Sequence, residues 1–113
     1  MSNQEKLAAK RLGPKDVPAV EIKNLRFEVI HWGKDRGEPQ NGGLIAAFDK
    51  NTGAELWTLK VYDVIYNQEL ESDVQDVFIV SMSKSLFCNK LKITDERKRK
   101  YIVDIDARTV SAN

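Results

Sequence analysis

The chain has 113 residues, which suits one ordinary domain and is too short for two. Hydrophobic residues make up 42% and charged residues 31%, so a core can form without disulfide or metal staples. The formal charge of +1 provides no global field that selects nucleic acid or anionic lipid, and the lack of an apolar stretch of about 18 residues excludes a membrane span.

The cysteine content and the N-terminal residues favour the cell interior. Cys88 is the only cysteine, which rules out an intrachain disulfide and is typical of a reducing compartment. Residues 1–10 lack the apolar run of an export signal. We therefore expect a cytoplasmic protein.

Residues 1–19 are expected to form an N-terminal arm or a short helix, and residues 20–113 a single β-rich domain. Ser2 and Glu5 have the spacing of a helix capping box, and a Gly-Pro pair at 13–14 would end such a helix. The apolar stripe of this segment is small, so a frayed arm and a docked helix both stay open.

The first strand is predicted from Val20 to Trp32. Its apolar residues alternate but change phase near Asn24, which predicts a β-bulge there. The polar, glycine-rich residues 33–43 that follow predict a long exposed loop.

The strongest local pattern is a β-hairpin over residues 43–66. Two apolar runs flank Asp49–Gly53, where the glycine can take a positive φ and the aspartate can bond its own turn. With Asp49 opposite Ala54, the predicted cross-strand pairs are Phe48 with Glu55, Ala46 with Trp57, and Leu44 with Leu59. The other side of the 42–66 ribbon is apolar as well, so we expect it to be central in a sheet or half of a homo-oligomer interface.

Residues 43–57, Gly-Leu-Ile-Ala-Ala-Phe-Asp-Lys-Asn-Thr-Gly-Ala-Glu-Leu-Trp, resemble one repeat of the quinoprotein-type β-propellers, whose blades carry a similar A-x-D-x-x-T-G-x-x-x-W run. The likeness covers about fifteen residues, and a propeller needs several blades whereas this chain has one copy. Hairpin chemistry accounts for it, because Asp and Gly bracket the turn and Trp packs across it. We therefore predict no quinone or other cofactor.

The C-terminal half continues the β pattern. Residues 67–76 form an acidic connection, residues 77–82 suit a buried strand, and residues 86–106 predict a second hairpin. In that hairpin the predicted pairs are Ile93 with Tyr101, Leu91 with Val103, and Lys90 with Asp104. The predicted fold is mainly β: one antiparallel sheet of about six strands, folded into a small barrel or sandwich.

His31 is the only histidine, which excludes a zinc site built on several imidazoles. A pair with Cys88 would be needed for a nucleophilic thiol, but a half-buried thiol and a strand-end histidine are the favoured interpretation. A small enzyme could still pair His31 with a carboxylate such as Asp63 or Asp76 at a pocket. No nucleotide-binding, hydrolase or metal motif is present, and we predict neither catalytic nor metal-ligating residues.

Two sets of residues are candidates for binding. The arms and tip of the last hairpin are basic, and a cationic hairpin can lie on nucleic-acid phosphates; its tip residues are Arg97, Lys98, Arg99 and Lys100, and Lys90 and Lys92 lie in its arm. Aromatic residues on a second sheet face can serve a partner or ligand, and these are Trp32, Tyr62 and Tyr66.

These patterns leave three functional hypotheses. The first is a non-catalytic binding or assembly module, with a homo-oligomer formed through the 42–66 ribbon. The second is a nucleic-acid-binding domain that uses the basic 90–100 hairpin. The third is the small enzyme with His31 and a carboxylate.

Overall fold

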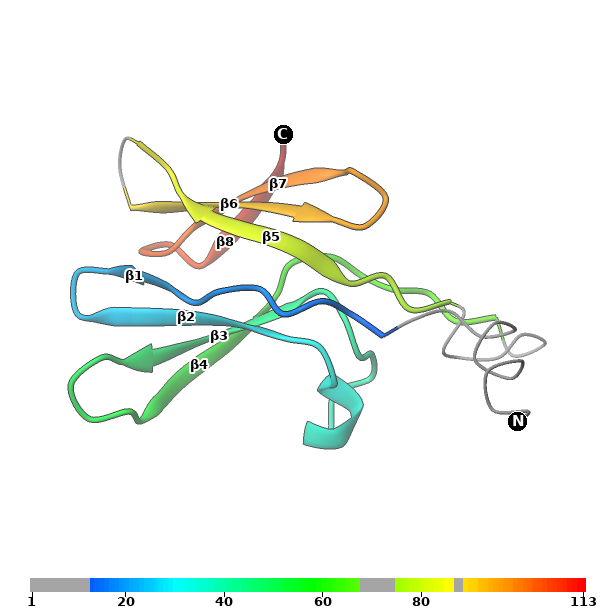
Figure 1. The fold of residues 1–113 in the computed structure, drawn as a ribbon, viewed down its shortest axis with the longest axis horizontal. Coiled ribbons are helices and arrows are strands. Elements are labelled where there is room, and N and C mark those ends of the chain that lie inside the picture. The colour runs from blue at the N-terminus through cyan, green and yellow to red at the C-terminus, as the bar shows by residue number, and fades with distance from the viewer. Residues whose placement is uncertain (1–12, 68–74, 87–88) are drawn as a thin grey trace, which may run out of the picture.

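The computed structural model describes residues 13–67, 75–86 and 89–113 and arranges them as two four-stranded antiparallel sheets that pack face to face (Figure 1). The predicted mainly β, antiparallel fold is confirmed. The predicted single sheet of about six strands is wrong, because the described residues form eight strands in two separate sheets and close no barrel.

Sheet A contains the first four strands in chain order: β1 (Val20–Ile22), β2 (Leu25–Ile30), β3 (Leu44–Asp49) and β4 (Glu55–Lys60). The bulge expected at Asn24 is wrong, because the chain reverses there with Lys23 at a φ of 57°. Ile22 pairs with Leu25 across this two-residue turn, so the residues on either side of it share a face. The turn is therefore the cause of the phase change in the sequence.

Sheet B contains the last four strands: β5 (Ile79–Lys84), β6 (Lys90–Asp95), β7 (Lys100–Asp104) and β8 (Thr109–Ala112). The predicted register of the β6–β7 hairpin is confirmed at all three pairs. Strand β8 was not predicted, because its sequence Thr-Val-Ser-Ala holds a single large apolar residue. Its pairing with β7 makes β8 one edge of the sheet and leaves β5 as the other.

The main core lies between the two sheets. Phe27, Ile45, Leu91, Ile93 and Val103 are at most 1% exposed and belong to one apolar cluster drawn from both sheets. Phe27, Leu91, Ile93 and Val103 alternate with less buried neighbours along their strands, whereas both neighbours of Ile45 are buried as well.

The register of the β3–β4 hairpin differs from the predicted one. Phe48 faces Glu55 as expected, but a bulge follows, so that Ala47 faces Trp57 and Ile45 faces Leu59. The extra residue turns Trp57 toward the core between the sheets, where its ring lies 5.9 Å from that of Phe27.

Part of the outer face of sheet A is covered by its own chain. Leu44 and Ala46 are buried there in a second, smaller apolar cluster with Ile30. Residues 33–43, predicted as an exposed loop, contain the 3-10 helix η1 (Gly33–Arg36); residues 34–37 and Pro39 are exposed as expected, whereas Gly33, Gln40, Gly42 and Gly43 are buried. Gly33 is required there, because a Cβ would lie 2.3 Å from the Leu44 side chain. Gln40, 3% exposed, anchors the loop by donating to the backbone oxygens of Gly42 and Tyr62, both at 2.8 Å.

The expected N-terminal arm or helix falls largely on residues 1–12, which lie outside the described residues, as do 68–74 of the acidic connection, Phe87 and Cys88. Residues 13–19 have no regular structure, and Val17 packs against the main core. Within the described part of the chain, no helix has the length and apolar character needed to cross a bilayer.

Candidate functional site

The outer face of sheet B is basic and rich in hydroxyl groups. The strand registers place three rows of side chains on it: Lys90, Asp104 and Thr109; then Ser83, Lys92, Ile102 and Ser111; then Ser81, Thr94 and Lys100. On the central strands β6 and β7 their neighbours point into the core, which leaves these rows toward solvent. We call these rows, together with the β6–β7 tip residues Arg97 and Lys98, the basic face.

Most cations of sheet A are neutralised by ion pairs, whereas those of the basic face are not. In and beside sheet A, the pairs are Arg26 with Glu28, Arg36 with Glu55, Lys50 with Glu21, and Lys60 with Asp63. Among the described residues, the cations of the basic face have no such partner: Lys90, Lys92, Arg97, Lys98 and Lys100. Asp104 is the one acidic residue of the basic face, and its Oδ1 accepts from the backbone N–H groups of Asp106 and Ala107 at 3.0 Å.

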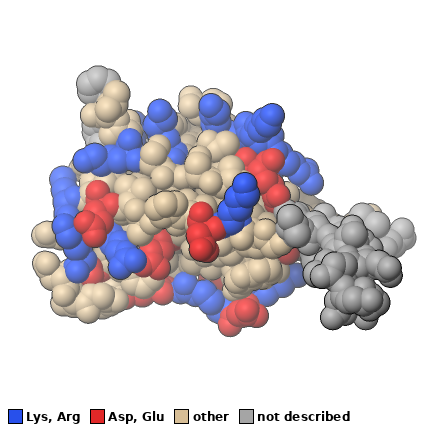
Figure 2. All heavy atoms as spheres, in the orientation of Figure 1, with Lys and Arg blue, Asp and Glu red and all other residues tan. Residues whose placement is uncertain are grey.

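The near-zero net charge of the chain hides a segregation of charge. Residues 79–113 hold eight Lys and Arg against four Asp and Glu, a formal charge of +4. Residues 1–78 hold ten against thirteen, a formal charge of −3, which restores the total of +1. Figure 2 shows basic atoms along the upper margin, over sheet B, and basic and acidic atoms intermixed below it. Sheet B therefore carries a local positive potential, although the net charge of the whole chain is close to zero.

Asp95 holds the tip of the β6–β7 hairpin in place. Its side chain is fully buried, and its Oδ1 accepts from the backbone N–H groups of Arg97 at 2.8 Å and Arg99 at 3.0 Å. Its Oδ2 accepts from Arg99 Nε at 2.8 Å and from the Tyr101 hydroxyl at 3.0 Å. The hydrogen bond to Asp95 raises the pKa of Arg99, while burial, then the bond to Asp95, raises the pKa of Tyr101. Asp95 thus binds Arg99 and leaves the other basic residues of the tip to solvent.

The four predicted tip residues are therefore not equivalent. Arg97, Lys98 and Lys100 are exposed and without an ion pair in the described structure, whereas Arg99 pairs with Asp95 and lies 5.9 Å from the Tyr62 ring. Lys90 and Lys92, which the alternation of the arm already placed outward, extend the tip into a longer surface. The hydroxyls of β5 and β8 were missed, because β8 was not predicted and the partners of β5 could not be assigned.

The three residues of the predicted aromatic set contact consecutive residues of the segment before β5, and they differ in exposure. Trp32 is 49% exposed with its ring 5.5 Å from that of Phe78, whereas Tyr62 is buried, stacks on Tyr101 at 5.1 Å, and donates from its hydroxyl to the Val77 carbonyl at 2.6 Å. Burial raises the pKa of Tyr62 far above its ordinary value.

Tyr66 belongs to a polar network that closes one end of the sandwich. Its hydroxyl donates to the buried carboxylate of Asp76 and accepts from the Asn41 backbone N–H at 3.2 Å. Burial, then the hydrogen bond to Asp76, raises the pKa of Tyr66 to about 12. The Lys34 ammonium lies 4.0 Å from the centre of the ring. This network ties the loop after β2 to the segment before β5.

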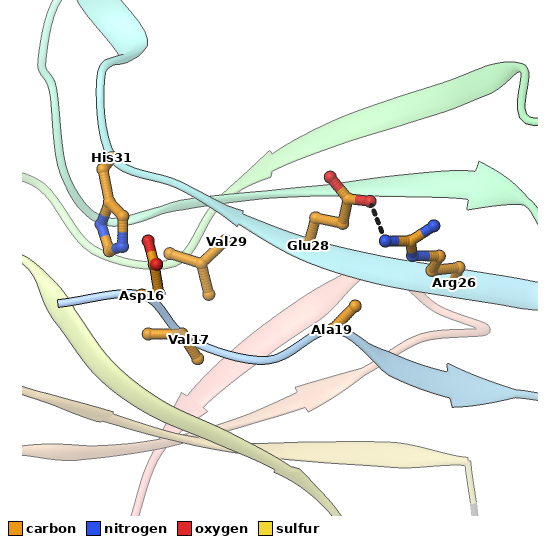
Figure 3. Close-up of a pocket in the computed structure, with 7 residues that line it drawn as sticks. All are labelled: Asp16, Val17, Ala19, Arg26, Glu28, Val29 and His31. Carbon is orange, nitrogen blue, oxygen red and sulfur yellow. Dashed lines mark ion pairs between the residues drawn. The ribbon is translucent and has the colours of Figure 1, made fainter.

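His31 lines an open pocket of about 230 Å³ where residues 16–19 diverge from β2 (Figure 3). Asp16 lies beside the imidazole, and Arg26 and Glu28 pair at the other end. Both ring nitrogens of His31 are buried without a hydrogen-bond partner. Burial lowers the pKa of His31, against the opposing effects of the Lys15 backbone and the Asp16 charge.

The carboxylates expected to pair with His31 are not among the residues that line this pocket. Asp76 bonds Tyr66 and Asn41, and Asp63 pairs with Lys60. Among the described residues, no three His, Cys, Asp or Glu side chains gather as metal ligands would. The chain matches no protein-family model, no curated protein and no solved structure.

Proposed function

We propose that this protein is a binding module that holds a nucleic acid by its phosphate groups on the basic face. The observation that carries the proposal is the set of five cations that have no ion pair in the described structure, while four cations in and beside sheet A are paired. Exposed cations that form no ion pair within the fold are available to neutralise the phosphate charges of a bound nucleic acid.

The expected strength follows from counterion release. If all five cations contact phosphates, the logarithm of the binding constant falls with the logarithm of salt at a slope of about −4.5 on duplex DNA. Raising the salt from 50 to 200 mM would then weaken binding roughly 500-fold. The proposal is compatible with the expected cytoplasmic location.

Self-assembly and catalysis have weaker support. The homo-oligomer was inferred from the second apolar side of the 42–66 ribbon, and on that side Leu44 and Ala46 are buried within the chain itself, Leu44 in contact with Gly33. An enzyme built on His31 would need a reachable imidazole nitrogen, and both nitrogens are buried.

Fluorescence anisotropy tests the proposal with a labelled 20-mer DNA, as duplex and as single strand, between 50 and 200 mM salt. The triple variant Lys92→Gln, Lys98→Gln, Lys100→Gln should bind at least about tenfold more weakly at 50 mM salt, and its salt slope on the duplex should fall to about −2.

The matched control removes the same charge from the other sheet. Arg26→Gln, Lys50→Gln, Lys60→Gln should keep at least half of the wild-type affinity and the full salt slope. Equal losses in both triple variants, or no binding of either DNA at 50 mM salt, would refute the proposal.

A further inference from the structure

We infer that the ligand of the basic face is a double-helical nucleic acid, held along one phosphate backbone without recognition of its bases. This inference rests on the proposed function and specifies its partner. It is carried by the layout of the cations and by the chemistry of the side chains around them.

The cations form a line along the β6–β7 ribbon. Lys90 and Lys92 are two residues apart on β6, about 6.8 Å, and Lys100 lies on β7 in the row after that of Lys92. From the Lys90 row to the Lys100 row the line covers about 14 Å, and the tip residues Arg97 and Lys98 extend it. One line of charge matches one row of phosphates.

Hydroxyl groups flank this line on both sides. Ser81 and Ser83 lie on β5, and Thr109 and Ser111 lie on β8, in the same rows as the lysines. Neutral hydroxyls donate hydrogen bonds to phosphate and sugar oxygens and carry no sequence information there. The basic face therefore offers a sugar–phosphate strand a charged centre with polar margins.

The basic face lacks a platform for bases. Among its described residues none is aromatic, and Ile102 is its one large apolar side chain. Tyr101, the nearest aromatic residue of the hairpin, packs against the main core instead. Binding of single strands gains much of its affinity from bases that stack on aromatic rings. A duplex keeps its bases stacked internally and presents a continuous phosphate backbone on its outside, which suits a surface of cations and hydroxyls without aromatic rings.

Direct competition separates this inference from the proposed function. Labelled 20-base-pair duplexes of DNA and of RNA, each in two unrelated sequences, are compared at 50 mM salt with the corresponding single strands and with vesicles of one-third phosphatidylserine. We expect either type of duplex to bind at least about fivefold more tightly than its single strand, and the two sequences to differ by less than twofold.

Each other outcome overturns a defined part of the scheme. Tighter binding of single strands, or a preference of tenfold or more for one duplex sequence, would overturn the duplex inference and leave the proposed function standing. If the protein binds the vesicles and binds no nucleic acid, both the duplex inference and the proposed function are wrong.

A second variant tests the polar margins. Ser83→Ala, Ser111→Ala removes one hydroxyl on each side of Lys92 and should weaken duplex binding about tenfold. The salt slope should stay unchanged, because neutral donors release no counterions. Thr58→Ala, on the outer face of sheet A, is the control and should leave duplex affinity unaltered. Full affinity of the double variant would overturn the placement of the backbone along the β6–β7 ribbon.

Discussion

The two sheets have the same strand order and differ in whether their exposed cations form ion pairs. Each is a four-stranded meander, and in each the third strand ends in an aspartate, Asp49 in β3 and Asp104 in β7. The Oδ1 atom of each aspartate accepts from the N–H groups two and three residues later. Four residues after each aspartate the chain takes a positive φ, at Gly53 and at Arg108.

The difference lies on the outer faces. Sheet A buries Leu44 and Ala46 on its outer face, where Gly33 of η1 contacts Leu44, and pairs most of its exposed cations. Sheet B leaves its outer face uncovered and its lysines without ion pairs in the described structure. Because the same strand plan serves both, the basic face is not a requirement of the fold, which is why we assign it to a partner.

The largest expected effect tests whether the two sheets share one core. Phe27→Ala removes a fully buried ring that contacts Trp57 and should lower the free energy of unfolding by about 3–5 kcal/mol. Ile102→Ala, on the outer face of sheet B, should cost less than about 1 kcal/mol. Urea unfolding followed by Trp fluorescence and by far-UV circular dichroism checks both variants. Separate transitions in the two signals would show that the sheets unfold independently.

The next largest effect compares two aspartates that accept hydrogen bonds from backbone N–H groups of their turns, Asp95 in the buried interior and Asp49 at an exposed turn. Asp95→Ala leaves the Tyr101 hydroxyl and the N–H groups of Arg97 and Arg99 without their acceptor beside the core, at a cost of about 2–4 kcal/mol. Asp49→Ala removes two hydrogen bonds at an exposed turn and should cost about 1 kcal/mol. Urea midpoints measure the difference, and equal losses would mean that burial of Asp95 adds nothing.

The sequence predicted local pairing better than the arrangement of sheets. Alternation fixed the β6–β7 register, because apolar pairs inside and Lys90 opposite Asp104 outside agreed on one alignment. Alternation did not predict the turn at Lys23, because a two-residue turn and a β-bulge both shift the alternation of apolar residues by one position. It also failed at β4, because nothing in Glu55–Leu56 marks the bulge that turns Trp57 inward.

The candidate site was predictable in its charges and unpredictable in its surroundings. Alternation alone predicts that Lys90 and Lys92 point outward, and the sequence shows that the hairpin tip is basic. Which cations are ion-paired depends on contacts distant in sequence, such as Arg36 with Glu55, and on the capture of Arg99 by the buried Asp95. The contact of Gly33 with Leu44 could not be predicted either, because a glycine-rich segment predicts a loop whether or not it packs against a sheet.

A smaller effect concerns His31, at the end of β2 where sheet A meets Phe78 before β5. Burial lowers the pKa of His31 in the folded state, so the unfolded chain, with a pKa of about 6.5, takes up the proton first. Stability should therefore fall as the pH drops below about 6.5, by at most about 1.4 kcal/mol per pH unit, until the folded pKa is reached. Thermal unfolding between pH 7.5 and 5.5 measures this.

The comparison variant for this pH dependence is His31→Phe. It replaces two buried nitrogens that lack partners with a ring of similar shape, so stability at pH 7.5 should stay equal or rise. The slope between pH 7.5 and 5.5 should disappear, because His31 is the only histidine of the chain. A slope that persists in this variant would assign the titration to another group.

The smallest expected effect bears most directly on the contrast between the sheets. Lys50→Gln, Lys60→Gln breaks two exposed ion pairs of sheet A and should lower the free energy of unfolding by no more than about 1 kcal/mol. Lys92→Gln, Lys100→Gln breaks no ion pair of the described structure and relieves repulsion on the basic face, so stability should stay equal or rise by a few tenths of a kcal/mol. Urea unfolding at low salt, where surface charge is least screened, measures both. If neutralising Lys92 and Lys100 instead destabilised the fold by more than about 1 kcal/mol, these lysines would be structural, and their exposure would no longer point to an external anion.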